Sequence, residues 1–416
     1  MSIKIGVFGG RRGDSMINWC STFSTEAEIV AICEKDDTVV KLLKSKYSDK
    51  DITYYSDFDD FINHDMDGVV LANYANEHAP YAVRCLTKGL NVLSEVLPCQ
   101  TLSEAVALVE AVEKSGKIYA YAENYCYMPA PLEMKRLYRE GKLGEFEYGE
   151  GEYIHNCEPI WDLITYGEKD HWRNNMHANF YCTHSIGPLL HITGLRPVKV
   201  SGFELPFNNA MARMGAKKGS VGMEIITLEN GAVIKSIHGD LRKNNIWFFL
   251  SGTLGRMESV REAMEPDGVV KICTDFDEKE SVFVGKRDVY EPMKSSAATK
   301  LGHVGSDFYS MHEFIAAING KKADVIGVYE ALDMSLPGIF AYFSVLDGGV
   351  PKEIPDLRDK KVRDAYRRDT RCTDPAVAGD MLLPSYSKGN PEIPDFVYEQ
   401  VRKRYEIHTA EQNKKK

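Results

Sequence analysis

The sequence predicts an α/β protein: an N-terminal doubly wound parallel sheet, followed by a C-terminal α+β domain with a large, mostly antiparallel open sheet. Three observations lead to this fold class. Short apolar strands alternate with helices through the first third, longer alternating runs follow residue 125, and 416 residues exceed one typical core. We therefore expect two domains and a tail, with boundaries at residues 1–125, 126–383 and 384–416.

The first domain contains continuously apolar strands, as expected for a parallel sheet buried on both faces. We predict strands at residues 3–8, 28–33, 68–72, 90–93 and 118–122. Helical patterns lie between them at residues 37–46 and 80–88, and Thr101 with Glu104 forms a capping box that opens a helix to about residue 114.

The second domain begins with a helix at residues 131–140 and continues in period-two strands. We predict these strands at residues 146–154, 220–228, 232–238 and 246–251, and later helices at residues 308–318 and 329–346. Asp307 is a candidate cap for the first of these later helices. The polar segment from residue 384 is expected to be a surface tail with a frayed end.

Composition limits the function classes. A net charge of −10 gives no reason to expect nucleic acid or an anionic membrane, so the expected partner is a small molecule. Nine cysteines without CxxC or metal-finger spacing indicate reduced thiols and no metal site. Because Met1 runs directly into an apolar strand with no signal-peptide zones, we expect a cytoplasmic protein.

A glycine-rich loop follows the first strand and predicts dinucleotide binding at a helix N-terminus. It reads Gly9-Gly10-Arg11-Arg12-Gly13, an imperfect GxGxxG match for which a simple tight turn is the alternative. Glu34, about 20 residues on at the end of the second strand, is placed to accept ribose hydroxyls and to repel a 2′-phosphate. NAD is therefore favoured over NADP, although the adjacent Lys35 weakens that preference.

Asn73, Asn76 and His78 follow the third strand at the edge where doubly wound sheets place ligands. We interpret them as cofactor contacts, with a capped turn before Pro80 as the alternative.

Several segments resemble the Gfo/Idh/MocA oxidoreductase family over roughly residues 1–360. They read VVLANYANEHAPYAVRCLTKGLNVLSEVLPCQT, AENYCY, GEGEYIHN and IFAYFSVLDGGVPKEIPD. The resemblance places Glu95 by the nicotinamide ribose, and Glu123 and Asn124 against cofactor and substrate, with helix capping as the alternative for Asn124. The family commonly has a lysine after this glutamate to assist proton transfer, whereas here Val96 follows Glu95.

Three motifs are more similar to the NAD-dependent glycosidases typified by bacterial alpha-N-acetylgalactosaminidases, which share the loss of that lysine. They are residues 179–188 (NFYCTHSIGP), 123–127 (ENYCY) and 149–155 (GEGEYIH). The resemblance implies transient oxidation of the sugar at C3, elimination of the aglycone from C1, addition of water and return of the hydride. This scheme requires no pair of carboxylates flanking the glycosidic bond.

His184 is the expected base at the C3 hydroxyl, and Tyr181 the expected polar partner, because a helical segment would place both on one side. A structural histidine is the alternative for His184. His155, at a strand end, is a candidate substrate contact or a buried, backbone-bonded histidine. Trp172 and Arg173 suit the apolar face and hydroxyls of a pyranose, with ordinary packing as the alternative.

The leading hypothesis is thus an NAD-dependent enzyme that hydrolyses a glycoside. Two alternatives stay open: an NAD-dependent dehydrogenase of a sugar, inositol or polyol, and a non-catalytic sugar or nucleotide sensor. From the resemblance we also expect a homodimer or homotetramer, associated through the open sheet.

Overall fold

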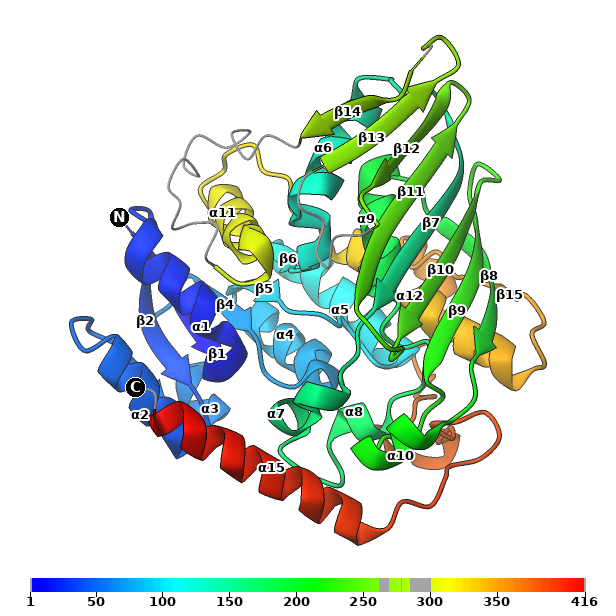
Figure 1. The fold of residues 1–416 in the computed structure, drawn as a ribbon. Helices are drawn as coiled ribbons and strands as arrows, with labels where there is room; N and C mark the ends of the chain where they lie inside the picture. The colour runs from blue at the N-terminus through cyan, green and yellow to red at the C-terminus, as the bar shows by residue number, and fades with distance from the viewer. Residues whose placement is uncertain (1, 262–268, 278, 285–300, 415–416) are drawn as a thin grey trace.

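Two β-sheets organise the chain. The computed structural model describes residues 2–261, 269–277, 279–284 and 301–414. A six-stranded sheet occupies the N-terminal part and a nine-stranded sheet the second part, as Figure 1 shows. The predicted fold class is confirmed.

The first sheet is entirely parallel and has the order β3-β2-β1-β4-β5-β6, the Rossmann arrangement in which strand order reverses between β1 and β4. Its strands are β1 (Ile3–Phe8), β2 (Ala27–Cys33), β3 (Thr53–Tyr55), β4 (Gly68–Leu71), β5 (Asn91–Ser94) and β6 (Tyr119–Tyr121). Five of the six lie within two residues of the predicted positions. The edge strand β3 was not predicted, because it is three residues long and only partly buried.

Helices connect these strands. They are α1 (Gly10–Asn18), α2 (Asp37–Lys46), α3 (Phe58–Phe61), α4 (His78–Thr87) and α5 (Leu102–Ser115). A π-helical turn, Trp19–Phe23, extends α1. The capping box is present: the Thr101 hydroxyl accepts from the Glu104 backbone N–H, and the Glu104 carboxylate accepts from that of Thr101.

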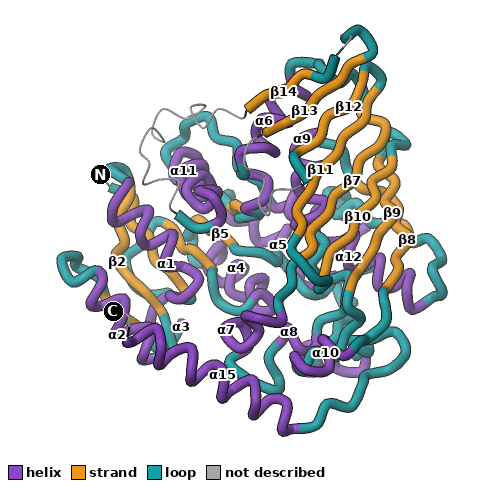
Figure 2. Tube along the Cα trace, in the orientation of Figure 1, coloured by secondary structure: helices purple, strands orange, loops and turns teal. Residues whose placement is uncertain are grey.

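The second sheet is antiparallel except where β10 pairs with β7, and its order is β14-β13-β12-β11-β7-β10-β9-β8-β15. Its strands are β7 (Phe146–Ile154), β8 (Pro197–Glu204), β9 (Val221–Leu228), β10 (Val233–Gly239), β11 (Asn245–Gly252), β12 (Gly255–Ser259), β13 (Val269–Thr274), β14 (Ser281–Val284) and β15 (Lys352–Glu353). In Figure 2 these strands form one side of the molecule.

Three helices cover the inner face of this sheet: α6 (Pro129–Arg139), α9 (Thr183–Thr193) and α12 (Val328–Leu346). Helix α12 also contacts α5 and β6, so this layer joins the sheet to the first domain. Helix α11 (Ser306–Ile318) packs against α1 and begins after Gly305, which is its N-cap, so Asp307 lies in the first turn and does not cap the helix. Shorter helices are α7 (Trp161–Thr165), α8 (Trp172–Asn175), α10 (Asn209–Met214), α13 (Lys360–Asp364) and α14 (Pro375–Ala378).

The C-terminal segment differs from the expected tail, because α15 (Asp395–Lys414) runs through most of it. Val397, Tyr398 and Val401 are buried, and Val401 joins a small core with Trp161 and Met211. In Figure 1 the red helix runs along the lower edge of the molecule, from below α10 to the neighbourhood of α2.

All nine cysteines lie among the described residues, and each is a free thiol. Among those residues no helix is both long and apolar enough to cross a bilayer.

Candidate functional site

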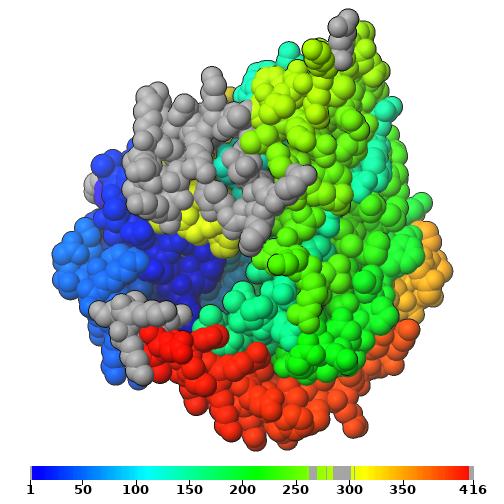
Figure 3. Space-filling model, viewed as in Figure 1, coloured from blue at the N-terminus to red at the C-terminus, as the bar shows by residue number. Residues whose placement is uncertain are grey.

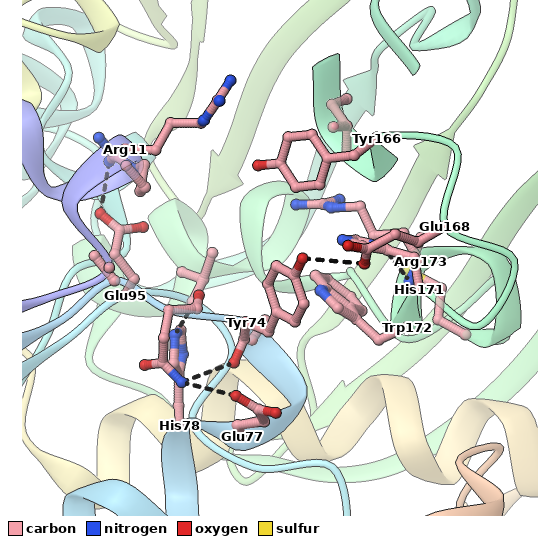
Figure 4. A pocket seen from close by; sticks show the side chains of 18 of the residues that line it. Arg11, Tyr74, Glu77, His78, Glu95, Tyr166, Glu168, His171, Trp172 and Arg173 are labelled. Carbon is pink, nitrogen blue, oxygen red and sulfur yellow. Dashed lines mark hydrogen bonds and ion pairs between the residues drawn. The ribbon is translucent and has the colours of Figure 1, made fainter. Parts of the chain in front are cut away.

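A cleft of about 1160 Å³ lies between the carboxyl edge of the parallel sheet and the second domain. The first domain contributes the glycine loop, the end of β2 and the turns after β4 and β5, and α15 contributes Tyr405. The predicted site residues that line the cleft are Gly9, Arg11, Arg12, Glu34, Asn73, His78, Glu95, Asn124, His155, Trp172, Arg173, Tyr181 and His184. Figure 4 shows part of this wall.

The loop after β1 requires glycine. Gly9 has φ +95°, and a Cβ there would lie 2.3 Å from the backbone oxygen of Ala72. A Cβ on Gly13 would lie 2.4 Å from the Val7 side chain, so this glycine lets α1 pack closely on β1. The loop therefore has the tight turn and close helix–strand contact of a dinucleotide site.

Glu34 lies beside the N-terminus of α1. Its Oε2 accepts from the backbone N–H of Gly10 at 2.9 Å and from that of Arg11 at 3.4 Å, while Oε1 accepts from Asp36 N at 2.9 Å. This carboxylate lines the cleft at the end of β2, where a ribose diol is expected. Lys35 also lines the cleft, and its Nζ lies 4.6 Å from the centre of the Tyr74 ring. These residues fit an NAD molecule.

Arg12 joins two buried acids. Its guanidinium lies 2.6 Å from Glu95 Oε1 and donates two hydrogen bonds to Asp307, at 2.8 and 2.9 Å. Burial raises the pKa of Glu95. Burial acts to raise the pKa of Asp307, but the charges and hydrogen bonds of Arg12 and His303 together outweigh it and hold that pKa below its usual range. Arg12 thus ties the turn after β5 to α11.

Of the three residues predicted as cofactor contacts in the turn after β4, two line the cleft and one does not. Asn73 and His78 line the cleft, but Asn76 does not, and its amide donates to Asp374 at 3.1 Å. His78 is buried with its ring nitrogens 3.0 Å from Leu97 O and 3.3 Å from Asn73 O, and burial lowers its pKa to about 4. A neutral imidazole has one N–H, so His78 donates to one of these two carbonyls while its ring packs between the two turns.

His184 and Glu123 form a buried pair. Helix α9 begins at Thr183, which places His184 in its first turn, with Nδ1 2.7 Å from Glu123 Oε1. The other carboxylate oxygen accepts from the Thr183 hydroxyl at 2.7 Å, and Tyr125 N donates to Oε1 at 3.2 Å. Glu123 is fully buried behind His184, whereas the imidazole lines the cleft. The carboxylate therefore orients the ring with one nitrogen toward the cavity.

Tyr181, Trp172 and Arg173 cluster beside His184. The rings of Tyr181 and His184 lie 5.0 Å apart, although Tyr181 precedes the helix and does not share its face. Arg173 donates to the Tyr181 hydroxyl at 3.2 Å and lies over the Trp172 ring at 4.5 Å. Burial raises the pKa of Tyr181.

His155 is linked to this group through Tyr153. Its Nδ1 lies 3.0 Å from the Tyr153 hydroxyl, and the Tyr153 ring lies 4.7 Å from that of His184. Burial lowers the pKa of His155. His155 thus lines the cleft, as expected for a substrate contact. Its ring is held by the Tyr153 hydroxyl and not by a backbone group, which was the alternative.

Several cleft residues were not predicted. Tyr153 stands within the GEGEYIH motif, and membership of that motif is the signal in the sequence that could have indicated it. Tyr74 donates to Glu168 at 3.2 Å across the cleft, as Figure 4 shows, and Tyr166 and Tyr405 line it further out. These pairings join residues distant in sequence, so no local pattern indicates them. Among the described residues no group of three or more His, Cys, Asp or Glu side chains is arranged to hold a metal ion.

Two family models match the chain. The model described as an oxidoreductase family with an NAD-binding Rossmann fold, Gfo/Idh/MocA, matches residues 3–123, and that of the glycosyl hydrolase 109 C-terminal domain matches residues 198–363. The first domain of the chain is therefore an NAD-binding Rossmann domain of the kind found in the Gfo/Idh/MocA oxidoreductases, and the later part of the chain matches a domain of glycosyl hydrolases.

Similar proteins agree with this assignment. One named glycosyl hydrolase family 109 protein, from Solibacter usitatus, is 26% identical over 397 residues, which cover 86% of this chain and 88% of the relative. Another of that name, from Parabacteroides distasonis, is 25% identical and covers 71% of this chain and 72% of its own length.

Solved structures share the fold. An oxidoreductase domain protein from Kribbella flavida superposes with a TM-score of 0.71 at 18% identity, covering 85% of this chain and all of the other. A scyllo-inositol dehydrogenase from Lactobacillus casei, solved with NAD(H) and scyllo-inositol, has a TM-score of 0.67 at 15% identity, covering 85% of this chain and 99% of the other.

Proposed function

We propose that this protein is an NAD-dependent glycosidase, which oxidises its sugar transiently at C3 and releases the aglycone by elimination. The observation that carries the proposal is the buried Glu123–His184 pair, whose imidazole faces a cleft at the carboxyl edge of an NAD-binding sheet. The glycosyl hydrolase 109 domain match supports the glycoside as substrate class. Val96 lines the cleft at the position where a lysine commonly serves the dehydrogenases of this family.

Two side chains of the cleft would carry the proton transfers of this reaction. His184 would take the proton of the sugar hydroxyl on its cleft-facing nitrogen, because Glu123 accepts from Nδ1 and stabilises the resulting imidazolium. Tyr181, polarised by Arg173, would be the second proton carrier. NAD, when bound, supplies a reversible hydride acceptor.

The same cleft accounts for sugar and cofactor binding. Trp172, Arg173 and His155 would contact the sugar, since a planar indole and a guanidinium suit a pyranose face and its hydroxyls. Glu34 would accept the adenosine ribose hydroxyls and Glu95 would lie by the nicotinamide ribose. Because a carboxylate at the end of β2 would repel a 2′-phosphate, Glu34 favours NAD over NADP.

The open face of the nine-stranded sheet supports a proposed homo-oligomer. Phe203 on β8 is 49% exposed and Ile225 on β9 is 40% exposed. Exposed apolar side chains on neighbouring strands favour burial against a second copy. Light scattering that gives the monomer mass would refute this proposal.

The deciding experiment incubates the protein with NAD⁺ and nitrophenyl glycosides, including alpha-N-acetylgalactosaminide, while nitrophenol and NADH are recorded together. Nitrophenol without stoichiometric NADH is expected. NADH that accumulates with free sugars or polyols, without aglycone release, would instead identify a dehydrogenase. Absence of both signals in a protein that binds NAD would favour a sensor.

A further inference from the structure

Helix α15 contributes a wall to the cofactor cleft, outside the part of the chain that either family model covers. Tyr405 on this helix lines the cleft, and its hydroxyl accepts a hydrogen bond from the Arg11 guanidinium at 2.9 Å. In Figure 3 the red C-terminal segment lies against both the blue first domain and the green second domain. The helix therefore bridges the two walls of the cleft.

Arg11, Tyr166 and Tyr405 form one cation–aromatic cluster. The guanidinium carbon of Arg11 lies 5.1 Å from the centre of the Tyr166 ring and 5.7 Å from that of Tyr405. The two tyrosine rings meet edge to face at 5.2 Å. Figure 4 shows Arg11 and Tyr166 facing each other. Arg11 comes from the glycine loop, Tyr166 from the segment after α7 and Tyr405 from α15, so three distant segments converge here.

The cluster lies at the adenosine end of the cleft. The backbone N–H of Arg11 points to Glu34 Oε2 at 3.4 Å, and the Glu34 charge also acts on the Tyr166 hydroxyl. Glu34 ends β2, the position that holds the adenosine ribose in a Rossmann domain. His184 and Tyr181, in contrast, line the cleft from the second domain, and the Glu95 charge acts on the Tyr181 hydroxyl.

Helix α15 is anchored unevenly. Its N-terminal half is fixed by Val397, Tyr398 and Val401, which are buried, and by Gly167, where an added Cβ would lie 2.5 Å from Arg402 N. Beyond Arg402, the described residues hold the helix by two polar contacts. These are the bond from Arg11 to Tyr405 and a 2.6 Å contact between His408 Nδ1 and Asp162 Oδ2.

We infer that α15 is a strap over the adenosine moiety of bound NAD, and that Arg11, Tyr166 and Tyr405 form its binding wall. Aromatic rings and a guanidinium offer planar surfaces to adenine and a cation to the pyrophosphate. The far half of the strap has to lift, breaking the contact between Arg11 and Tyr405, before the dinucleotide leaves. The inference rests on the NAD-binding domain and is independent of the proposed glycosidase chemistry.

The test measures cofactor release from the full-length protein. Protein loaded with NADH is mixed with excess NAD⁺, and the loss of bound-NADH fluorescence gives the dissociation rate. We expect Tyr405→Ala to release NADH about 5-fold faster or more, since stacking of a base on an aromatic ring is typically worth at least about that factor. Tyr405→Phe, which keeps the ring and loses the hydroxyl, should give an intermediate rate.

Ile407→Ala is the matched control, because Ile407 is 56% exposed on the same helix and does not line the cleft. It should release NADH at the wild-type rate. Equal acceleration by Tyr405→Ala and Ile407→Ala, or none by Tyr405→Ala, would overturn the strap. Gly167→Ala tests it without removing any side chain of the cluster: displacement of α15 at Arg402 should also accelerate release, and an unchanged rate would contradict the strap.

Calorimetric titration with the two halves of the cofactor locates the wall. Tyr405→Ala should weaken binding of AMP and leave binding of nicotinamide mononucleotide unchanged. Equal weakening of both would overturn the adenosine assignment. Neither titration requires turnover. A protein that shows no glycosidase activity can therefore still confirm or refute the strap by its binding of AMP and nicotinamide mononucleotide.

Discussion

The Nδ1 atom of His184 lies 2.7 Å from Oε1 of Glu123, a residue 61 positions earlier that is completely buried. A carboxylate in this position fixes the tautomer of the ring and stabilises its protonated form. The proposed base therefore depends on a residue that has no surface in the cleft.

Glu123→Gln is expected to lower turnover about 10²-fold or more while NAD binding persists. The amide keeps the shape of the side chain but removes the charge that stabilises the imidazolium, and positioned acid–base catalysis contributes about 10²–10⁴-fold. Steady-state kinetics and NAD titration of the same samples measure both quantities. Thr183→Val is the control, because it removes a partner of Oε2 without touching His184. Full activity in Glu123→Gln would reject the role of the pair.

The first domain was predictable because burial on both faces imposes an apolar run on each strand. Strand β1 was predicted with its observed bounds, and β4 within one residue. Helix α15 was not predicted, because few of its side chains are buried. Of its side chains, Val397, Tyr398 and Val401 are buried in a polar sequence, a stripe too narrow to distinguish from a tail.

The site was predictable as a set of residues but not as an arrangement. Motif resemblance pointed to both Glu123 and His184, but it assigned Glu123 to the cofactor, and the structure places it behind the imidazole. Asn76 belongs to the same turn as Asn73 and yet faces Asp374, because its direction depends on packing against a segment almost 300 residues away. Such relationships depend on tertiary contacts that no local spacing contains.

Arg12→Leu should lower the free energy of unfolding by about 3–5 kcal/mol at neutral pH, since it leaves the buried Glu95 without its ion-pair partner and Asp307 with only its contacts to Ser15 and His303. Urea unfolding measures this loss. The Arg12→Leu/Asp307→Asn double variant should recover part of it, which a double-mutant cycle will show. Strictly additive effects would contradict the coupling.

The same network predicts that the contribution of Asp307 to stability changes its pH dependence in Arg12→Leu, whereas Glu95, whose pKa is already raised in the wild type, keeps the same sign in both proteins. Asp307 has a lowered folded pKa, so its stabilising contribution is present above its unfolded pKa of about 3.9 and is lost as the pH falls through the folded value. In Arg12→Leu both carboxyls take up protons more readily in the folded state. Mild acidification should therefore stabilise the variant relative to wild type, and parallel pH profiles of stability would contradict this.

Glu104→Gln is expected to flatten the stability profile between pH 5 and 8. Burial raises the pKa of Glu104 to about 7, so its contribution is fully present below the unfolded pKa of about 4.3 and is lost as the pH rises through 7. Glutamine keeps an acceptor for the capping box, and the variant should gain stability relative to wild type as the pH rises. Urea unfolding across this range measures the difference.

Glu110→Gln, on the same helix, is the control for this prediction. A hydrogen bond from Arg367 lowers the pKa of Glu110, so this acid is ionised in both the folded and unfolded states above pH 5. Its difference from wild type should stay constant with pH. A pH-dependent difference of similar size in both variants would point to a general charge effect.

Gly9→Ala should abolish NAD binding and destabilise the first domain. Its left-handed conformation alone costs alanine about 1–2 kcal/mol, and the new methyl group would lie 2.3 Å from the Ala72 backbone oxygen, which has no side-chain freedom to move. Gly116→Ala separates the two effects, because Gly116 also has a positive φ, of +62°, but no atom within 4 Å of the added carbon. Thermal unfolding and NAD titration of both variants should show a moderate loss of stability with normal affinity for Gly116→Ala, and a larger loss without binding for Gly9→Ala. Equal stability losses with retained affinity would mean that the turn after β1 tolerates a side chain, and the close approach of α1 to the end of β4 would no longer explain the cofactor loop.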